Sequence, residues 1–166
     1  MARSMHRRVA MTVLMLLSSA ALSAAPSASA APSSVADYDP CSGEAVTKRL
    51  LTIGPNLVGG PRQTVRFNCG QEEGEGVSWG LRHIVAGHAK LPTEQDFENL
   101  KTCVTLLATD WRGYVKEDSD WVFRRVNRDG VTWRMVVRDT TVNDRGVITI
   151  FAQGEDNEKL NWNQCA

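Results

Sequence analysis

Four cysteines limit how this 166-residue chain can fold. No two of them are closer than 28 residues, whereas cysteines that bind a metal usually come in closely spaced pairs. An even number of cysteines in an exported protein predicts disulfide bonds, so we expect two bridges and no metal site. Three pairings are possible, and the sequence does not rank them. The cysteines are Cys41, Cys69, Cys103 and Cys165.

The N-terminus has the pattern of a cleavable export signal. Residues 1–8 contain three arginines and no acid, and residues 9–22 are apolar but too few for a bilayer span, which needs about 20 residues. The Ala-Ser-Ala segment at 28–30 follows the pattern that signal peptidase cleaves. The adjacent Arg7 and Arg8 leave both the general secretory route and the twin-arginine route open.

We therefore expect a secreted, extracellular protein that has no membrane segment in its mature form. Its parts would be a signal peptide over 1–30, a flexible leader over 31–40 and a single disulfide-stapled domain over 41–166.

Cleavage after residue 30 would change the charge of the protein. The full chain has 19 basic and 19 acidic residues, and the signal holds three of the basic residues and none of the acidic ones, so the mature net charge is −3. Nucleic-acid-binding proteins are usually more basic, so this charge counts against a polyanionic partner. Cleavage also removes His6 and leaves two histidines, His83 and His88.

Three segments are expected to form helices. Residues 42–51 can form a short helix capped by Ser42. Residues 78–89 carry apolar side chains at helical spacing. Residues 93–108 begin with Thr93 and two acids in the first turn, which favour a helix start.

The remaining patterned segments are expected to form strands. Residues 63–69 alternate between apolar and polar side chains. Residues 120–128 and 131–139 flank an Asp-Gly pair, which is a strong signal for a hairpin turn, and residues 147–153 form a further strand. The sequence therefore predicts an α+β domain, in which two to three helices are followed by an antiparallel β-meander of about four strands.

His83 and His88 are the candidate acid–base residues, because imidazole exchanges protons near neutral pH. A spacing of five residues rotates two side chains about 140° apart on a helix, so the rings can meet only if the helix ends or bends near Gly87. The alternative is that His88, on the apolar face of the helix, is a hydrogen-bonded core residue. Zinc binding is not expected, because a helical metal pair needs a different spacing.

The predicted hairpin carries five arginines. Because side chains alternate along a strand, Arg124 and Arg128 share one side and Arg125 points to the other. Arg134 and Arg138 likewise share a side of the second strand. Such a cluster could bind phosphate groups bidentately and stabilise a charged transition state. The alternative is an ordinary solvated face that neighbouring aspartates partly neutralise.

Two short motifs frame this hairpin. Residues 80–88 read Gly-Leu-Arg-His-Ile-Val-Ala-Gly-His and precede a helix that contains Phe97, and residues 147–151 read Val-Ile-Thr-Ile-Phe. In this order, residues 79–153 resemble the barnase/EndoU/colicin/RelE-like ribonuclease superfamily, and above all the small nuclease domains of bacterial polymorphic toxins. The last strand has Phe151 where the family more commonly has Tyr, and the stretch 31–78 is not covered.

The resemblance implies a metal-independent endoribonuclease without a cofactor, in which a ribose 2′-OH attacks the neighbouring phosphate. His83 and His88 would be base and acid. Arg124 or Arg134 would hold the phosphate, and Thr149 would position the substrate. Further candidate substrate-binding residues are Arg82, Arg125 and Trp79. The expected partner is RNA; a cognate immunity protein could accompany such a toxin, and we expect a monomer.

A non-enzymatic secreted binding protein, such as an inhibitor or an interaction module, is the alternative function. Many small disulfide-bonded α+β domains are inhibitors, and the acidic mature charge fits that class. A nuclease needs a histidine and the arginines in one site, whereas an inhibitor would have them buried or scattered. Other hydrolases are disfavoured, because the sequence has no Gly-x-Ser-x-Gly elbow, HExxH helix or phosphate-binding glycine loop.

Overall fold

The computed structural model describes residues 37–72, 77–110, 113–156 and 160–165. The signal peptide expected over 1–30, and residues 31–36 of the expected leader, lie outside this part of the chain. No helix within the described ranges is long and apolar enough to cross a membrane.

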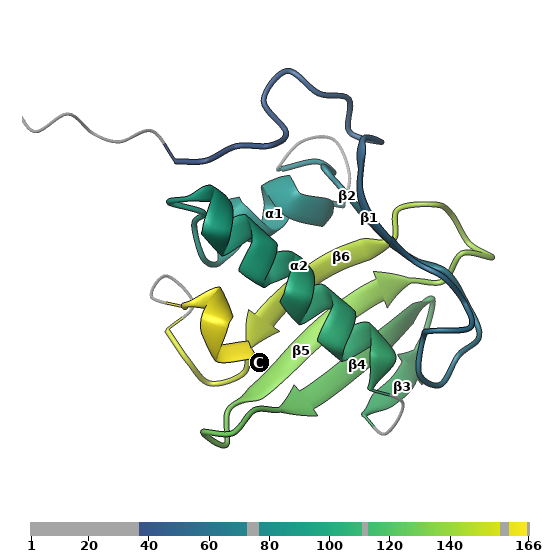
Figure 1. Ribbon diagram of the computed structural model, residues 1–166. Coiled ribbons are helices and arrows are strands. Elements are labelled where there is room, and N and C mark those ends of the chain that lie inside the picture. The colour runs from purple at the N-terminus through teal and green to yellow at the C-terminus, as the bar shows by residue number, and fades with distance from the viewer. Residues whose placement is uncertain (1–36, 73–76, 111–112, 157–159, 166) are drawn as a thin grey trace, which may run out of the picture. The chain divides into compact units, whose positions relative to one another are not determined.

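A four-stranded antiparallel sheet forms the centre of the domain (Figure 1). Across the sheet its strands are β3 (Tyr114–Glu117), β4 (Asp120–Val126), β5 (Thr132–Arg138) and β6 (Val147–Ala152). Each strand pairs with the next one along the chain, so the sheet is a meander and the expected α+β class is confirmed. The sequence pattern does not mark β3, because all four of its residues are exposed and no apolar alternation distinguishes them.

The β4–β5 hairpin turns at the expected Asp-Gly pair. The Oδ1 atom of Asn127 accepts hydrogen bonds from the backbone N–H groups of Asp129, at 3.0 Å, and Val131, at 2.8 Å. Gly130 has a φ of 82°, which glycine adopts without steric cost. The turn therefore sets the register of the two strands and decides which side chains lie opposite each other.

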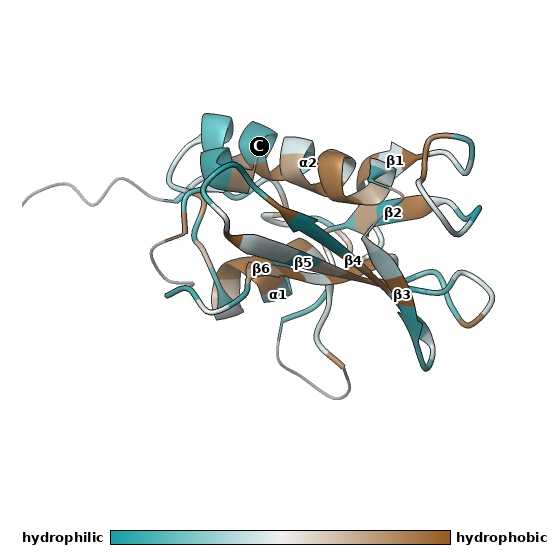
Figure 2. Ribbon diagram, turned by 90° about the horizontal axis from the view of Figure 1, so that it is seen from below, coloured by the Kyte–Doolittle hydropathy of each residue, from teal (hydrophilic) through white to brown (hydrophobic). Residues whose placement is uncertain are grey.

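Two helices accompany the sheet, α1 (Gly80–Gly87) and α2 (Glu94–Thr109), close to the segments predicted. Thr93 and Asp96 form a capping box at the start of α2. α2 lies along one face of the sheet, and α1 lies beside β6 toward the opposite face (Figure 2). Large side chains of the core between α2 and the sheet are Phe97, Leu100, Leu107, Phe123, Trp133, Met135 and Ile150.

The prediction of a helix over residues 42–51 is wrong. Residues of this segment instead enter β1 (Arg49–Ile53), which pairs antiparallel with β2 (Val65–Asn68) in a separate two-stranded sheet. Turns precede β1, with Gly43 at a φ of 71°. A helix this short is marginal by itself, whereas pairing with β2 supplies backbone hydrogen bonds to the strand, with one irregularity between Arg49 and Leu51. The strand expected over 63–69 is confirmed as β2.

Two disulfides connect these elements, Cys41–Cys69 and Cys103–Cys165. The first joins the segment before β1 to the residue that follows β2. The second joins α2 to the C-terminal 3-10 helix η2 (Trp162–Cys165). All four cysteines are buried. The structure confirms the two expected bridges and selects one of the three pairings that the sequence left open.

Candidate active site

The two faces of the four-stranded sheet differ in character. Most of the side chains that face α2 are apolar and buried, as Phe123 and Met135 illustrate. Because side chains alternate along a strand, the intervening residues point to the other side. We call this second side, which carries Arg124, Arg134, Thr149 and Phe151, the polar face.

α1 brings both histidines to the edge of the polar face. The helix ends at Gly87, and His88 leaves the helical path with φ −136° and ψ −111°, while its backbone N–H still donates to the carbonyl oxygen of Ile84 at 2.9 Å. The ring centroids of His83 and His88 consequently lie 5.8 Å apart, with an interplanar angle of 77°. A helix end near Gly87 is the condition under which the two rings can meet, and the structure fulfils it.

His88 is held against the last strand of the sheet. Its Nε2 atom lies 2.9 Å from Oγ1 of Thr149, and its ring stacks on Phe151 with centroids 5.6 Å apart. The Nδ1 atom is buried and has no hydrogen-bond partner among the described residues. The residue as a whole is half-buried rather than part of the closed core. His88 thus forms a wall of the site and keeps one ring nitrogen engaged with a hydroxyl group.

The surroundings lower the pKa of His88 below the ordinary histidine value of 6.5. Burial of the ring is the larger cause, because it disfavours the charged imidazolium, and the nearby His83 is the second. His88 is therefore neutral at pH 7, which is the form that can accept a proton.

Arg124 and Arg134 form a second cluster on the polar face. They lie directly opposite each other on β4 and β5, and both bind Glu117. The Nη2 atom of Arg124 lies 2.8 Å from one carboxylate oxygen, and that of Arg134 lies 2.7 Å from the other. Arg134 is also the cross-strand neighbour of Phe151, which stacks on His88. The arginines and the histidines therefore share one face of the sheet.

Arg138 and Lys116, which also lie near the hairpin, each pair with one carboxylate. The Nε atom of Arg138 lies 2.5 Å from Oδ1 of Asp120, and Nζ of Lys116 lies 2.7 Å from Oδ2 of Asp139. Hydrogen bonds from Lys116 and from Thr141 hold the pKa of Asp139 well below its usual range. Asp139 is therefore a firmly ionised anchor at the start of the β5–β6 loop.

Three candidate substrate-binding residues lie away from the polar face. Arg82 donates to three backbone carbonyl oxygens beside the Cys41–Cys69 disulfide, at 2.6 to 2.9 Å, which occupies its guanidinium group. Arg125 points to the α2 side of the sheet by strand alternation. Trp79 is only 7% exposed and forms a β-bridge with Gln71. The structure does not bring these residues together with the histidines.

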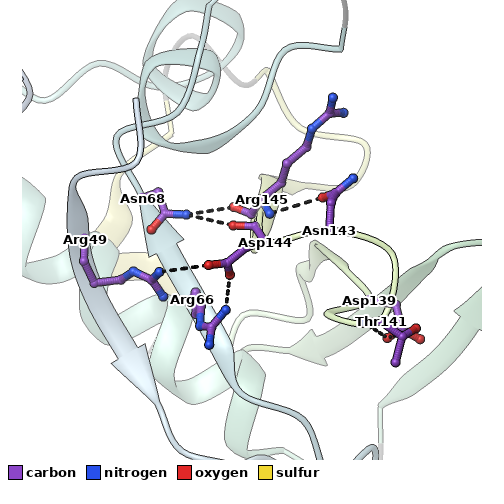
Figure 3. Close-up of polar contacts among 8 residues, drawn as sticks. All are labelled: Arg49, Arg66, Asn68, Asp139, Thr141, Asn143, Asp144 and Arg145. Atoms are coloured by element: carbon purple, nitrogen blue, oxygen red, sulfur yellow. Dashed lines mark hydrogen bonds and ion pairs between the residues drawn. The ribbon is translucent and has the colours of Figure 1, made fainter. Parts of the chain in front are cut away.

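The loop between β5 and β6 is tied to the two-stranded sheet (Figure 3). Asp144 forms ion pairs with Arg49 and Arg66. The Nδ2 atom of Asn68 donates to the carbonyl oxygens of Asp144, at 3.4 Å, and Arg145, at 3.1 Å. Because this loop leads directly into β6, these contacts determine where the last strand begins and so support the wall of the site.

Glu117 is a residue of this cluster that the sequence pattern does not single out. It ends β3, an exposed strand without apolar alternation. The available signal is its place in an acidic segment, 117–120, directly before the basic hairpin.

No group of three or more His, Cys, Asp or Glu in the described part of the chain is placed to hold a metal ion. A cavity of about 400 Å³ lies beside α1, among residues that include Tyr38, Leu81 and Leu91, and neither histidine lines it. His88 instead contacts Thr149 of β6, and the two arginines lie on β4 and β5.

Comparison of the chain with family models, with curated proteins and with solved structures gives no match.

Proposed function

We propose that this protein is a secreted endoribonuclease that needs no metal ion and acts as an antagonistic toxin. The observation that carries the proposal is the meeting of His83 and His88 beside the face that holds Arg124 and Arg134. In the proposed reaction a ribose 2′-OH attacks the neighbouring phosphate. The products are a 2′,3′-cyclic phosphate and a free 5′-OH.

His88 is the proposed general base. Its lowered pKa keeps it neutral at pH 7, and its contact with Thr149 orients the ring. It takes the proton of the 2′-OH, either directly or through the hydroxyl group of Thr149. His83 donates a proton to the departing 5′ oxygen, so one proton is removed and one is supplied.

The arginine pair is the proposed phosphate site. A guanidinium group presents parallel N–H donors that match two oxygens of a phosphate, and such charged hydrogen bonds are stronger than neutral ones. Negative charge builds up on the phosphate oxygens in the transition state, where fixed cations stabilise it. Arg124 and Arg134 stand on adjacent strands and can therefore act on one phosphate together.

The placement of the histidines supports an enzyme over a non-enzymatic binding protein. His83 and His88 are both partly exposed and lie next to each other, and neither is locked into the closed core. The mature charge of −3 expected from the sequence favours the binding protein. We give the arrangement of the side chains more weight, because catalysis depends on the local field at the site and not on the net charge.

Cleavage of RNA tests the proposal directly. Purified, oxidised protein is incubated with tRNA and with total RNA in excess EDTA, and the 3′ ends of the products are analysed. We expect fragments that end in a 2′,3′-cyclic phosphate. His83→Ala should lower the rate at least about a hundredfold, because a positioned acid or base contributes that much.

Two arginine variants separate the site from general charge effects. Arg134→Gln should lower the cleavage rate, whereas Arg128→Gln, at the exposed hairpin turn, should leave it unchanged although it removes the same charge. Absence of cleavage by the wild-type protein, or equal cleavage by His83→Ala, would contradict the mechanism.

A further inference from the structure

The arginine pair has an uneven charge balance. Like charges directly opposite each other on neighbouring strands destabilise a sheet, yet Arg124 and Arg134 are cross-strand partners. Glu117 is the carboxylate that the structure places between them, with its oxygens 2.8 Å and 2.7 Å from the two guanidinium groups. One carboxylate thus pairs with two guanidinium groups, so the cluster of Glu117, Arg124 and Arg134 has a net charge of one positive unit.

The neighbouring ion pairs differ from this cluster. Asp120 pairs with Arg138, and Asp139 pairs with Lys116, one charge against one charge. Among the ion pairs that join the strands of the four-stranded sheet, the Arg124–Arg134 cluster is therefore the one with two guanidinium groups against one carboxylate, and an excess of positive charge attracts a further anion.

Glu117 is placed where its side chain can leave. The side chains of Glu117 and Arg124 are 44% and 41% exposed, and ion pairs this accessible to water are weak. Glu117 is the last residue of β3, and Asp118, which follows it, has a φ of 51° in the tight turn to β4. The unesterified oxygens of a phosphate group can accept hydrogen bonds from both arginines at once.

We propose that Glu117 is a built-in occupant of the phosphate position. Its carboxylate bridges Arg124 and Arg134 in the free protein, and a phosphate group of the substrate binds there by displacing it. This inference rests on the proposed function for the identity of the ligand as RNA. The Nε atom of Arg134 is buried and has no hydrogen-bond partner in the described part of the chain, so Glu117 does not satisfy all the donors of this guanidinium group.

Removal of the internal carboxylate should therefore strengthen phosphate binding. Inorganic phosphate is titrated into the full oxidised protein at constant ionic strength, and the arginine Nε–H signals are followed by NMR. We expect Glu117→Gln to bind phosphate about five- to tenfold more tightly than the wild type, because one weak competing ion-pair interaction is lost at each arginine. Glu117→Gln combined with Arg134→Gln should lose this binding.

Asp120→Asn is the matched control. It removes one carboxylate from the same face, next to Arg138, and changes the net charge by the same amount. We expect it to bind phosphate as the wild type does. An equal gain in Asp120→Asn and Glu117→Gln, no gain in Glu117→Gln, or no phosphate binding by any variant would each overturn the inference.

The assay also separates this inference from the proposed function. If Glu117→Gln gains phosphate affinity but no variant cleaves RNA, the displaceable carboxylate stands and the ribonuclease proposal fails. If the wild type cleaves RNA but Glu117→Gln gains no affinity, the ribonuclease proposal stands and the role of Glu117 fails.

Discussion

At the scale of single residues, His88 shows how the surroundings of a side chain change its acid–base properties. The residue combines a half-buried ring, a stacking partner in Phe151 and a hydroxyl contact at Thr149. Burial and the neighbouring His83 both lower its pKa. The same surroundings that favour a proton acceptor at pH 7 make protonation unfavourable in acid, so the residue links the proposed chemistry to stability.

Acidification should therefore reduce the stability of the folded protein through His88. The unfolded chain has the ordinary histidine pKa of 6.5 and takes up a proton before the folded His88 does, so the free energy of unfolding falls as the pH drops below about 6.5. Above that pH both states are neutral at this residue, and its contribution is constant. Urea unfolding between about pH 5 and pH 8 measures the slope.

In His88→Gln, the free energy of unfolding should depend less on pH in this range, because the glutamine side chain does not titrate. NMR titration of His88 in a His83→Gln variant gives an independent check. The pKa of His88 should rise toward its ordinary value when the nearby imidazole is removed. A slope that is unchanged in His88→Gln would show that another group causes it.

At the scale of elements, the site depends on how β6 is anchored. The loop before this strand is tied to β2 through Asp144 and Asn68 (Figure 3). Gly146 lies at the end of the loop with a φ of 73°, and a Cβ atom there would lie 2.0 Å from the carbonyl oxygen of Arg66. The close approach of the two backbones therefore requires glycine for two reasons, its conformation and its size.

A pair of glycine variants separates these reasons. Gly130→Ala imposes only the strain of a positive φ, since no heavy atom lies within 4 Å of the added Cβ, and should cost about 1 kcal/mol. Gly146→Ala adds a clash with backbone and should cost about 3 kcal/mol, together with a loss of RNA cleavage as β6 shifts. Thermal or urea unfolding measures both. An equal decrease in the free energy of unfolding for the two variants would show that the β5–β6 loop can shift to accommodate the added Cβ atom.

At the scale of the whole molecule, the two disulfides join segments that are far apart in the sequence. Cys103–Cys165 closes a loop of 62 residues and fastens η2 to α2, while Cys41–Cys69 closes 28 residues beside the carbonyl groups that bind Arg82. Because Arg82 lies in α1, the Cys41–Cys69 bridge supports the helix that contains His83 and ends directly before His88.

The two bridges should differ in their effects on stability and activity. Loop-closure entropy predicts that replacement of Cys103 and Cys165 by Ala lowers the free energy of unfolding by about 4 kcal/mol, and replacement of Cys41 and Cys69 by somewhat less. We expect the second change to reduce RNA cleavage more, because it loosens α1. Urea unfolding and the cleavage assay, on the variants that remain folded at low temperature, measure this. Greater loss of activity without Cys103–Cys165 would contradict the proposed role of the Cys41–Cys69 bridge.

Much of the architecture could be predicted from local patterns. The Asp-Gly turn, the capping box at Thr93 and the apolar stripe of α2 are signals that act within a few residues, and the structure has all three. Residues 42–51 and β3 could not be predicted in this way. Residues 49–51 of the first segment are strand because they pair with β2, and β3 is an exposed edge strand whose backbone pairs with β4.

The sequence by itself determined the number of disulfides, the α+β class and the alternation that puts Arg134 and Arg138 on one side of β5. Only the tertiary structure decided the cysteine pairing, the meeting of His83 with His88, and the carboxylate of Glu117 between the arginines. The physical reason is the range of the interactions. Turns, caps and strand alternation depend on neighbours along the chain, whereas the site assembles from groups on α1, β3, β4, β5 and β6 that only packing brings together.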